Sequence, residues 1–140
     1  MSTKIQVGSR AFFNQYPDFE PSDNDFVEIH DDADVDFWVT NEDGEHIFHF
    51  RKMEKLEFIE FELNRSKNLA LVVSKFIVPE IIEYFGITME DLFTFIGVFD
   101  NIGRKHQYVK FIFDSYLKNG DFTLTDEQRD EAYYMYKVVR

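Results

Sequence analysis

The order of apolar and polar positions divides the chain into a strand-like first third and a helical remainder. Alternating apolar and polar residues predict short strands at residues 4–7, 25–29, 37–40 and 46–51. Asn41-Glu42-Asp43-Gly44 is a hairpin turn signal between the last two of these strands. A short helix is expected to open at Arg10, and Pro17 and Pro21 limit its length because proline ends helical stretches.

The rest of the chain carries apolar residues at helical spacing. This spacing predicts helices near residues 54–63, 69–85, from Thr88 onward, 105–117 and 126–138. Gly86 and Gly120 are expected to stop two of these helices, and Pro79 to start or kink the second half of the helix before Gly86. Thr125 and Gln128 have the spacing of a capping box, which favours a helix start at that point.

This order of elements predicts an α+β fold, in which a small mixed sheet in the N-terminal third packs against a helical C-terminal half. A length of 140 residues suits a single domain. Within it, residues 1–52 form the sheet-rich part and residues 53–140 the helical part. The 17 Phe, 7 Tyr and single Trp supply ample core material, so most aromatic rings are expected to be structural.

Composition narrows the kind of protein further. The chain has no cysteine, which excludes disulfides and thiolate zinc sites. It begins with a polar segment rather than an apolar signal region, and its longest nearly apolar stretch, residues 69–78, is too short to span a bilayer. We therefore expect a soluble, cytoplasmic protein without a membrane partner.

The formal net charge of −12 bears on the choice of partners. A surface of this sign repels phosphate backbones, so strong binding to duplex DNA is not expected. The acidic surplus is concentrated between Asp18 and Glu45. Such a surplus fits two interpretations, a site that gathers Mg²⁺ or a solvated, loop-rich edge.

One motif carries candidate chemistry. Val7-Gly8-Ser9 is followed, after a spacer of 13 residues, by Asp23-Asn24-Asp25-Phe26. This pattern resembles the catalytic strand–helix–strand of the nucleotidyltransferase superfamily, which includes DNA polymerase β-like and minimal nucleotidyltransferases. The resemblance covers about the first thirty residues. It departs from the usual pattern at Asn24, which is less apolar than the residue commonly found between the two acids.

The residue types of this motif suit metal-dependent chemistry on a nucleotide. Asp23 and Asp25 are two positions apart on a strand, so both are expected on one face, where Mg²⁺ relieves their repulsion. Gly8 allows a triphosphate to approach the backbone, and Ser9 is expected to hydrogen-bond phosphate oxygens. Arg10 is expected to add a charge-assisted contact. The resemblance implies transfer of a nucleoside monophosphate from a nucleoside triphosphate to a hydroxyl group.

Two aspects of this hypothesis stay open at the level of sequence. The family usually has a third acid on a later strand, and Asp36 in Val35-Asp36-Phe37 is favoured over Glu45 for that role. The acceptor is also undefined: a small molecule, an RNA end or a protein side chain would each supply a hydroxyl.

An alternative interpretation needs no catalysis. Pro21 and Ser22 make Asp23 a plausible turn residue, and the chain is then a non-enzymatic acidic interaction protein, antitoxin-like or a nucleic-acid mimic, with a basic protein partner. Arg104, Lys105, His106 and Lys110 form the one local basic group in the sequence. This group either meets nucleic acid or a partner, or balances the acidic surface.

Overall fold

The computed structural model describes residues 2–19, 25–30, 36–40, 46–51, 74–75, 77–93 and 95–139. Its contacts divide the chain into two compact units, Met1–Arg65 and Ser66–Arg140. All described strands lie in the first unit, and all but one of the described α-helices lie in the second. The predicted α+β class is therefore confirmed.

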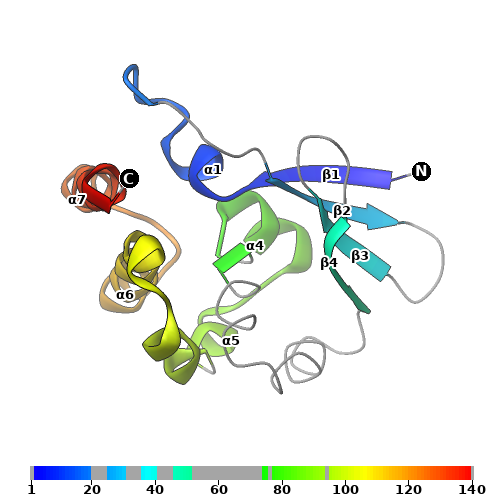
Figure 1. Cartoon of the computed structure of the whole chain (residues 1–140). Helices are drawn as coiled ribbons and strands as arrows, with labels where there is room; N and C mark the ends of the chain where they lie inside the picture. The colour runs from blue at the N-terminus through cyan, green and yellow to red at the C-terminus, as the bar shows by residue number, and fades with distance from the viewer. Residues whose placement is uncertain are drawn as a thin grey trace. The chain divides into compact units, whose positions relative to one another are not determined.

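The first unit contains a four-stranded sheet in the order β1-β2-β3-β4, seen in Figure 1. The strands are β1 (Ser2–Val7), β2 (Asp25–His30), β3 (Asp36–Thr40) and β4 (His46–Arg51). Every neighbouring pair is antiparallel, so the expectation of a mixed sheet is wrong for the described strands. Each strand pairs with its neighbour in sequence and runs back beside it, whereas a parallel neighbour needs a crossover connection.

The register of the sheet fixes which residues share an end. Val7 is the Cα partner of Asp25 at one end of the β1–β2 pair, and Ser2 is the partner of His30 at the other. Along the same direction, Thr40 is the partner of both Phe26 in β2 and His46 in β4. We call the end that holds these pairs, at Val7, Asp25, Phe26, Thr40 and His46, the Val7 end of the sheet.

Where burial is described in the first unit, buried side chains come from β1, β2 and the helix that follows β1. Ile5 is the partner of Val27, and both are buried, as is Val7 two residues further along β1. Helix α1 (Ser9–Phe13) adds Phe12 and Phe13, and Phe13 is fully buried. Figure 1 shows α1 directly beyond the end of β1, opposite the N-terminus. Burial of these aromatic rings anchors the chain where it leaves the sheet.

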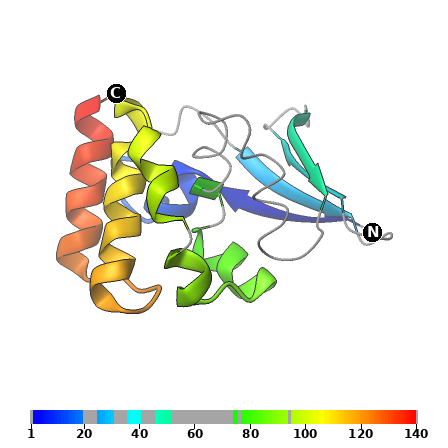
Figure 2. The same cartoon turned by 90° about the horizontal axis from the view of Figure 1, so that it is seen from below.

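The second unit is helical. Its elements are α4 (Pro79–Phe85), α5 (Met89–Phe93), the 3₁₀ segments η1 (Ile96–Asn101) and η2 (Arg104–His106), α6 (Gln107–Asn119) and α7 (Asp126–Val139). Helices α6 and α7 pack side by side, as Figures 1 and 2 both show. The rings of Phe99 and Phe113 stack with centroids 4.3 Å apart. The buried hydroxyl of Tyr116 donates a hydrogen bond to the carbonyl of Ile77 at 3.1 Å.

The helix ends follow the sequence signals closely. Gly86 and Gly120 end α4 and α6 in the left-handed conformation, with φ of 62° and 74°. Pro79 starts α4 rather than kinking a longer helix. The 3₁₀ segment η1 is not predicted by the sequence pattern, and the helix expected near residues 54–63 lies outside the described residues. Among the helices that the structure describes, none has the length and apolar character that crossing a membrane requires.

Candidate functional site

The Gly8 bend is the best-defined feature of the predicted site. Gly8 has φ 81° and ψ −158°, a backbone conformation that is essentially restricted to glycine. This conformation ends β1 at Val7 and turns the chain directly into α1, whose first two residues are Ser9 and Arg10. The amide of Ala11 donates to the carbonyl of Gly8 at 3.1 Å and closes the first turn. The glycine that the motif requires is thus also required by the fold.

The strand register brings this bend to Asp25. Val7 and Asp25 are direct Cα partners, and Asp25 is the first residue of β2. Antiparallel partners lie up to about 5.5 Å apart and successive Cα atoms 3.8 Å apart, so the Cα of Gly8 lies within about 9 Å of the Cα of Asp25. Asp23 lies outside the described residues. Asp25 is therefore the one predicted metal ligand whose backbone the structure describes, and that backbone lies beside the Gly8 bend.

Asp36 is at the other end of the sheet. It is the first residue of β3 and the Cα partner of Arg51, and its neighbour Phe37 is the partner of Ile29. At about 3.4 Å per residue, the roughly five positions along β2 from Asp25 to this level amount to about 17 Å. Ligands of one cation lie within about 2.6 Å of it. The strand register therefore makes Asp36, the favoured third acid, unsuitable for a role beside Asp25.

The Val7 end of the sheet holds positions that the sequence motif did not single out. Thr40 and His46 are Cα partners, and Thr40 is also level with Phe26, next to Asp25. The hairpin turn signal between β3 and β4 could have predicted the pairing of Thr40 with His46, because a hairpin pairs the residues that flank its turn. Glu45, the alternative third acid, directly precedes His46 in the chain and lies outside the described residues.

Metal-ligating groups elsewhere in the described part of the chain do not gather into a site. Among its residues there is no group of three or more His, Asp or Glu side chains that could hold a metal ion. Asp23 and the side chains of Asp25 and Asp36 are outside that set.

A second charged feature lies in the helical unit. Arg104, Lys105 and His106 form the single turn of η2, directly before α6. The pKa of the half-buried His106 is lowered, first by burial and then by the positive charges of Lys75 and Lys105. Lys75, 31 residues earlier in the chain than His106, is therefore close enough to act on the imidazole. We call Lys75, Arg104, Lys105 and His106 the basic patch.

Comparison with known proteins gives no further guide to the activity. No protein-family model matches the chain, and the searches found no matching curated protein and no matching solved structure.

Proposed function

We propose that this chain is a nucleotidyltransferase-like protein that transfers a nucleoside monophosphate from a nucleoside triphosphate to a hydroxyl acceptor. The observation that carries the proposal is the pairing of Val7 with Asp25. Because of this pairing, the bend at Gly8, a conformation that only glycine adopts readily, lies beside Asp25, the acid of the motif with which β2 begins. Two separate parts of the sequence pattern, 17 residues apart in the chain, thus meet at one end of the sheet.

Each residue has a role in this proposal. Gly8 leaves the backbone open to the triphosphate, Ser9 donates its hydroxyl to a phosphate oxygen, and Arg10 adds a guanidinium contact. Asp23 and Asp25 offer carboxylate oxygens, which are the ligands that Mg²⁺ prefers. When bound, Mg²⁺ supplies charge neutralisation to the phosphates during transfer. Of the two candidate third acids, Glu45 remains, and it would accept the proton of the attacking hydroxyl.

A thermal-shift experiment on the full chain tests the proposal. Wild-type protein is heated with each nucleoside triphosphate, with and without Mg²⁺, and compared with the double variant Asp23→Asn plus Asp25→Asn. A ligand at one hundred times its Kd stabilises the folded state by about 2.7 kcal/mol, which shifts the melting temperature measurably. We expect this stabilisation for wild type only when nucleotide and Mg²⁺ are both present, and its loss in the double variant.

Two control variants sharpen the result. Glu83→Gln plus Glu131→Gln removes two exposed carboxylates from α4 and α7 and changes the net charge from −12 to −10, as the aspartate pair does. This control separates specific binding from general screening by Mg²⁺ and should keep the nucleotide effect. Asp36→Asn should keep it as well, because the register separates Asp36 from Asp25. If nucleotide with Mg²⁺ does not raise the melting temperature of wild type, a non-enzymatic acidic interaction protein becomes the better interpretation.

A further inference from the structure

We propose that His46 and His49 in β4 bind one divalent transition-metal cation, with Zn²⁺ as the type case, through their imidazole nitrogens. The proposal does not rest on nucleotidyl transfer, because it concerns other residues and another class of metal than the candidate Mg²⁺ site. It starts from a shift in the pairing of β3 with β4, which places the two histidines on one face of the sheet.

The register shift changes the face on which one histidine lies. In a regular strand successive residues alternate between the two faces, so residues three positions apart lie on opposite faces. His49 is the Cα partner of Trp38, and His46 is the Cα partner of Thr40. Two steps along β3 thus correspond to three steps along β4, with Ile47 as the extra residue. Trp38 and Thr40 share a face because they are two positions apart. Their partners His46 and His49 share that face with them.

The distribution of apolar residues over the sheet agrees with this placement. One face of β1 and β2 is buried, at Ile5, Val7 and Val27. The register continues this face to Phe48 and Phe50 in β4. Unbroken alternation through β4 would put position 46 on the same apolar face as position 48. The extra residue instead transfers position 46 to the opposite face.

That opposite face is polar. We call it the polar face, and it contains His46 and His49. Its positions in β1 and β2 are exposed or half-buried, and those whose burial is described are Lys4, Gln6, Phe26 and Glu28. The paired histidines are therefore on the face of the sheet that is not buried in β1 and β2. Asp25, the partner of Val7, is on the other face.

The spacing of the two histidines suits a shared metal ion. They are level with two residues of β3 that are two positions apart, so they lie about 7 Å apart along the strand direction. Histidines four positions apart on a helix, with Cβ atoms about 5–6 Å apart, bind one Zn²⁺. Imidazole ligands favour zinc, copper and nickel, whereas carboxylates favour magnesium. The side chains of His46 and His49 are outside the described set in which no three-ligand group occurs.

The third histidine of the sheet is too far along it to join this pair. His30 is on the polar face, but it is the Cα partner of Ser2. Phe26 is level with His46 through Thr40, and His30 lies four positions further along β2. This offset amounts to about 14 Å along the strand direction, twice the separation of the proposed ligands.

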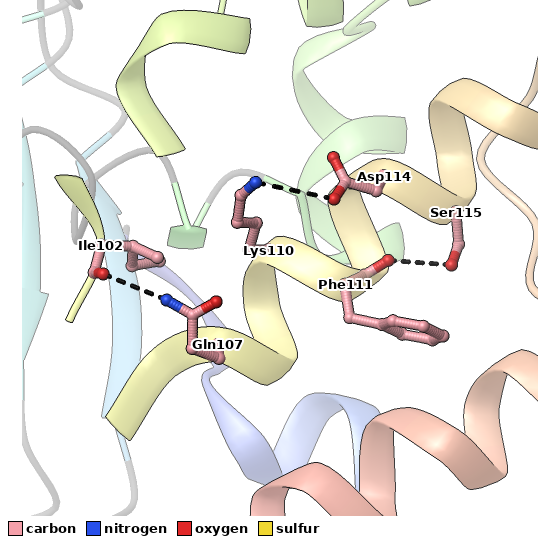
Figure 3. A network of polar contacts seen from close by, with 6 residues as sticks. All are labelled: Ile102, Gln107, Lys110, Phe111, Asp114 and Ser115. Carbon is pink, nitrogen blue, oxygen red and sulfur yellow. Dashed lines mark hydrogen bonds and ion pairs between the residues drawn. The ribbon is translucent and has the colours of Figure 1, made fainter. Parts of the chain in front are cut away.

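The fourth histidine lies among positive charges. The pKa of His106 is lowered by burial and by the charges of Lys75 and Lys105, and the same charges repel a metal cation. The acid that follows in α6, Asp114, pairs with Lys110 at 3.8 Å, as Figure 3 shows. His106 is therefore a poor metal ligand and a suitable control.

The test measures binding of ZnCl₂ to the full chain by isothermal titration calorimetry, without nucleotide and in excess Mg²⁺. The Mg²⁺ occupies carboxylate sites, which compete for cations in a chain with 27 acidic residues. The variant is His46→Gln plus His49→Gln. Its matched control is His30→Gln plus His106→Gln, which also removes two of the four histidines and leaves the formal net charge at −12.

We expect wild type to bind one Zn²⁺ per chain. Loss of outer-shell partners alone costs about 10–100-fold in metal affinity, so loss of both ligands should weaken binding at least tenfold. The control should bind as wild type does. Electron paramagnetic resonance with Cu²⁺ as the probe should show coupling to two imidazole nitrogens in the control protein, whose only histidines are His46 and His49. This spectrum decides the outcome even if the His46→Gln plus His49→Gln protein does not fold.

Three outcomes would overturn the inference. These are no Zn²⁺ binding by wild type in the presence of Mg²⁺, equal losses of affinity in the variant and its control, and coupling of Cu²⁺ to fewer than two nitrogens in the control. The Asp23→Asn plus Asp25→Asn protein should bind Zn²⁺ as wild type does. Its behaviour distinguishes failure of this inference from failure of the proposed transfer.

Discussion

At the scale of single residues, Gly8 decides the geometry of the candidate nucleotide site. Its positive φ, with ψ near −158°, lies in a region where a side chain on Cα is strained. Phe12 and Phe13, four and five residues later, are buried and fix the direction of the chain after the bend. The bend is therefore held from both sides, by β1 and by the aromatic rings of α1.

We predict that Gly8→Ala destabilises the protein by about 1–3 kcal/mol, the usual cost of a residue in such a backbone region. Gly97→Ala is the matched control, because its Cβ would meet nothing within 4 Å and its φ is not positive. That control should stay within about 0.5 kcal/mol of wild type. Urea unfolding of the three proteins gives the comparison, and equal stability of Gly8→Ala and wild type would remove the conformational argument for Gly8.

At the scale of elements, short side-chain caps define where α5 and α7 of the second unit begin. The hydroxyl of Thr88 accepts from the amide of Asp91 at 3.1 Å, and the Asp91 carboxylate accepts from the Thr88 amide at 2.9 Å. Thr125 and Gln128 form the same reciprocal pair at the start of α7. The side chain of Gln128 also exchanges hydrogen bonds with the Asn119 amide, which ties the start of α7 to the end of α6.

We predict that Thr125→Ala costs about 0.5–2 kcal/mol of stability, because the amide of Gln128 loses its acceptor. Thr125→Ser keeps a hydroxyl at the N-cap and should restore most of this loss. Chemical unfolding measured by circular dichroism checks both variants. A serine variant as unstable as the alanine variant would show that the methyl group of Thr125, rather than its hydroxyl, supports the helix start.

At the scale of the whole molecule, the charge balance sets the response to salt. Acidic residues outnumber basic ones by 27 to 15, and the resulting self-repulsion opposes the compact state. Added salt screens this repulsion, with a Debye length that falls to about 8 Å at physiological ionic strength. The same screening accompanies any addition of Mg²⁺, which is why the nucleotide test needs a control of equal charge.

We predict that raising NaCl to about 0.15 M stabilises wild type by on the order of 1 kcal/mol, seen as a rise of a few degrees in the melting temperature. Glu83→Gln plus Glu131→Gln should show a smaller rise, since its net charge is −10 rather than −12. Calorimetry at a series of salt concentrations measures both. A melting temperature that falls with salt would mean that specific ion pairs outweigh the general repulsion.

Local sequence signals were sufficient for most of the described elements. The strand at 46–51 has the predicted bounds, and the caps at Thr125 and Gly120 lie where the pattern places them. These features depend on contacts between residues a few positions apart, which a sequence records directly. The 3₁₀ segment η1 has no such signature. The pattern of apolar and polar residues therefore did not predict it.

The sequence by itself determined the class of fold, the excess of acid and the residue types of the candidate nucleotide site. Only the tertiary structure decided which of those residues meet. The pairing of Val7 with Asp25 supports the site, and the register that carries Asp36 to the other end of the sheet removes one of its expected members. Strand register and the approach of Lys75 to His106 arise from contacts between distant segments. The spacing of residues along one sequence does not encode such contacts, because many tertiary arrangements of the chain are compatible with the same local pattern.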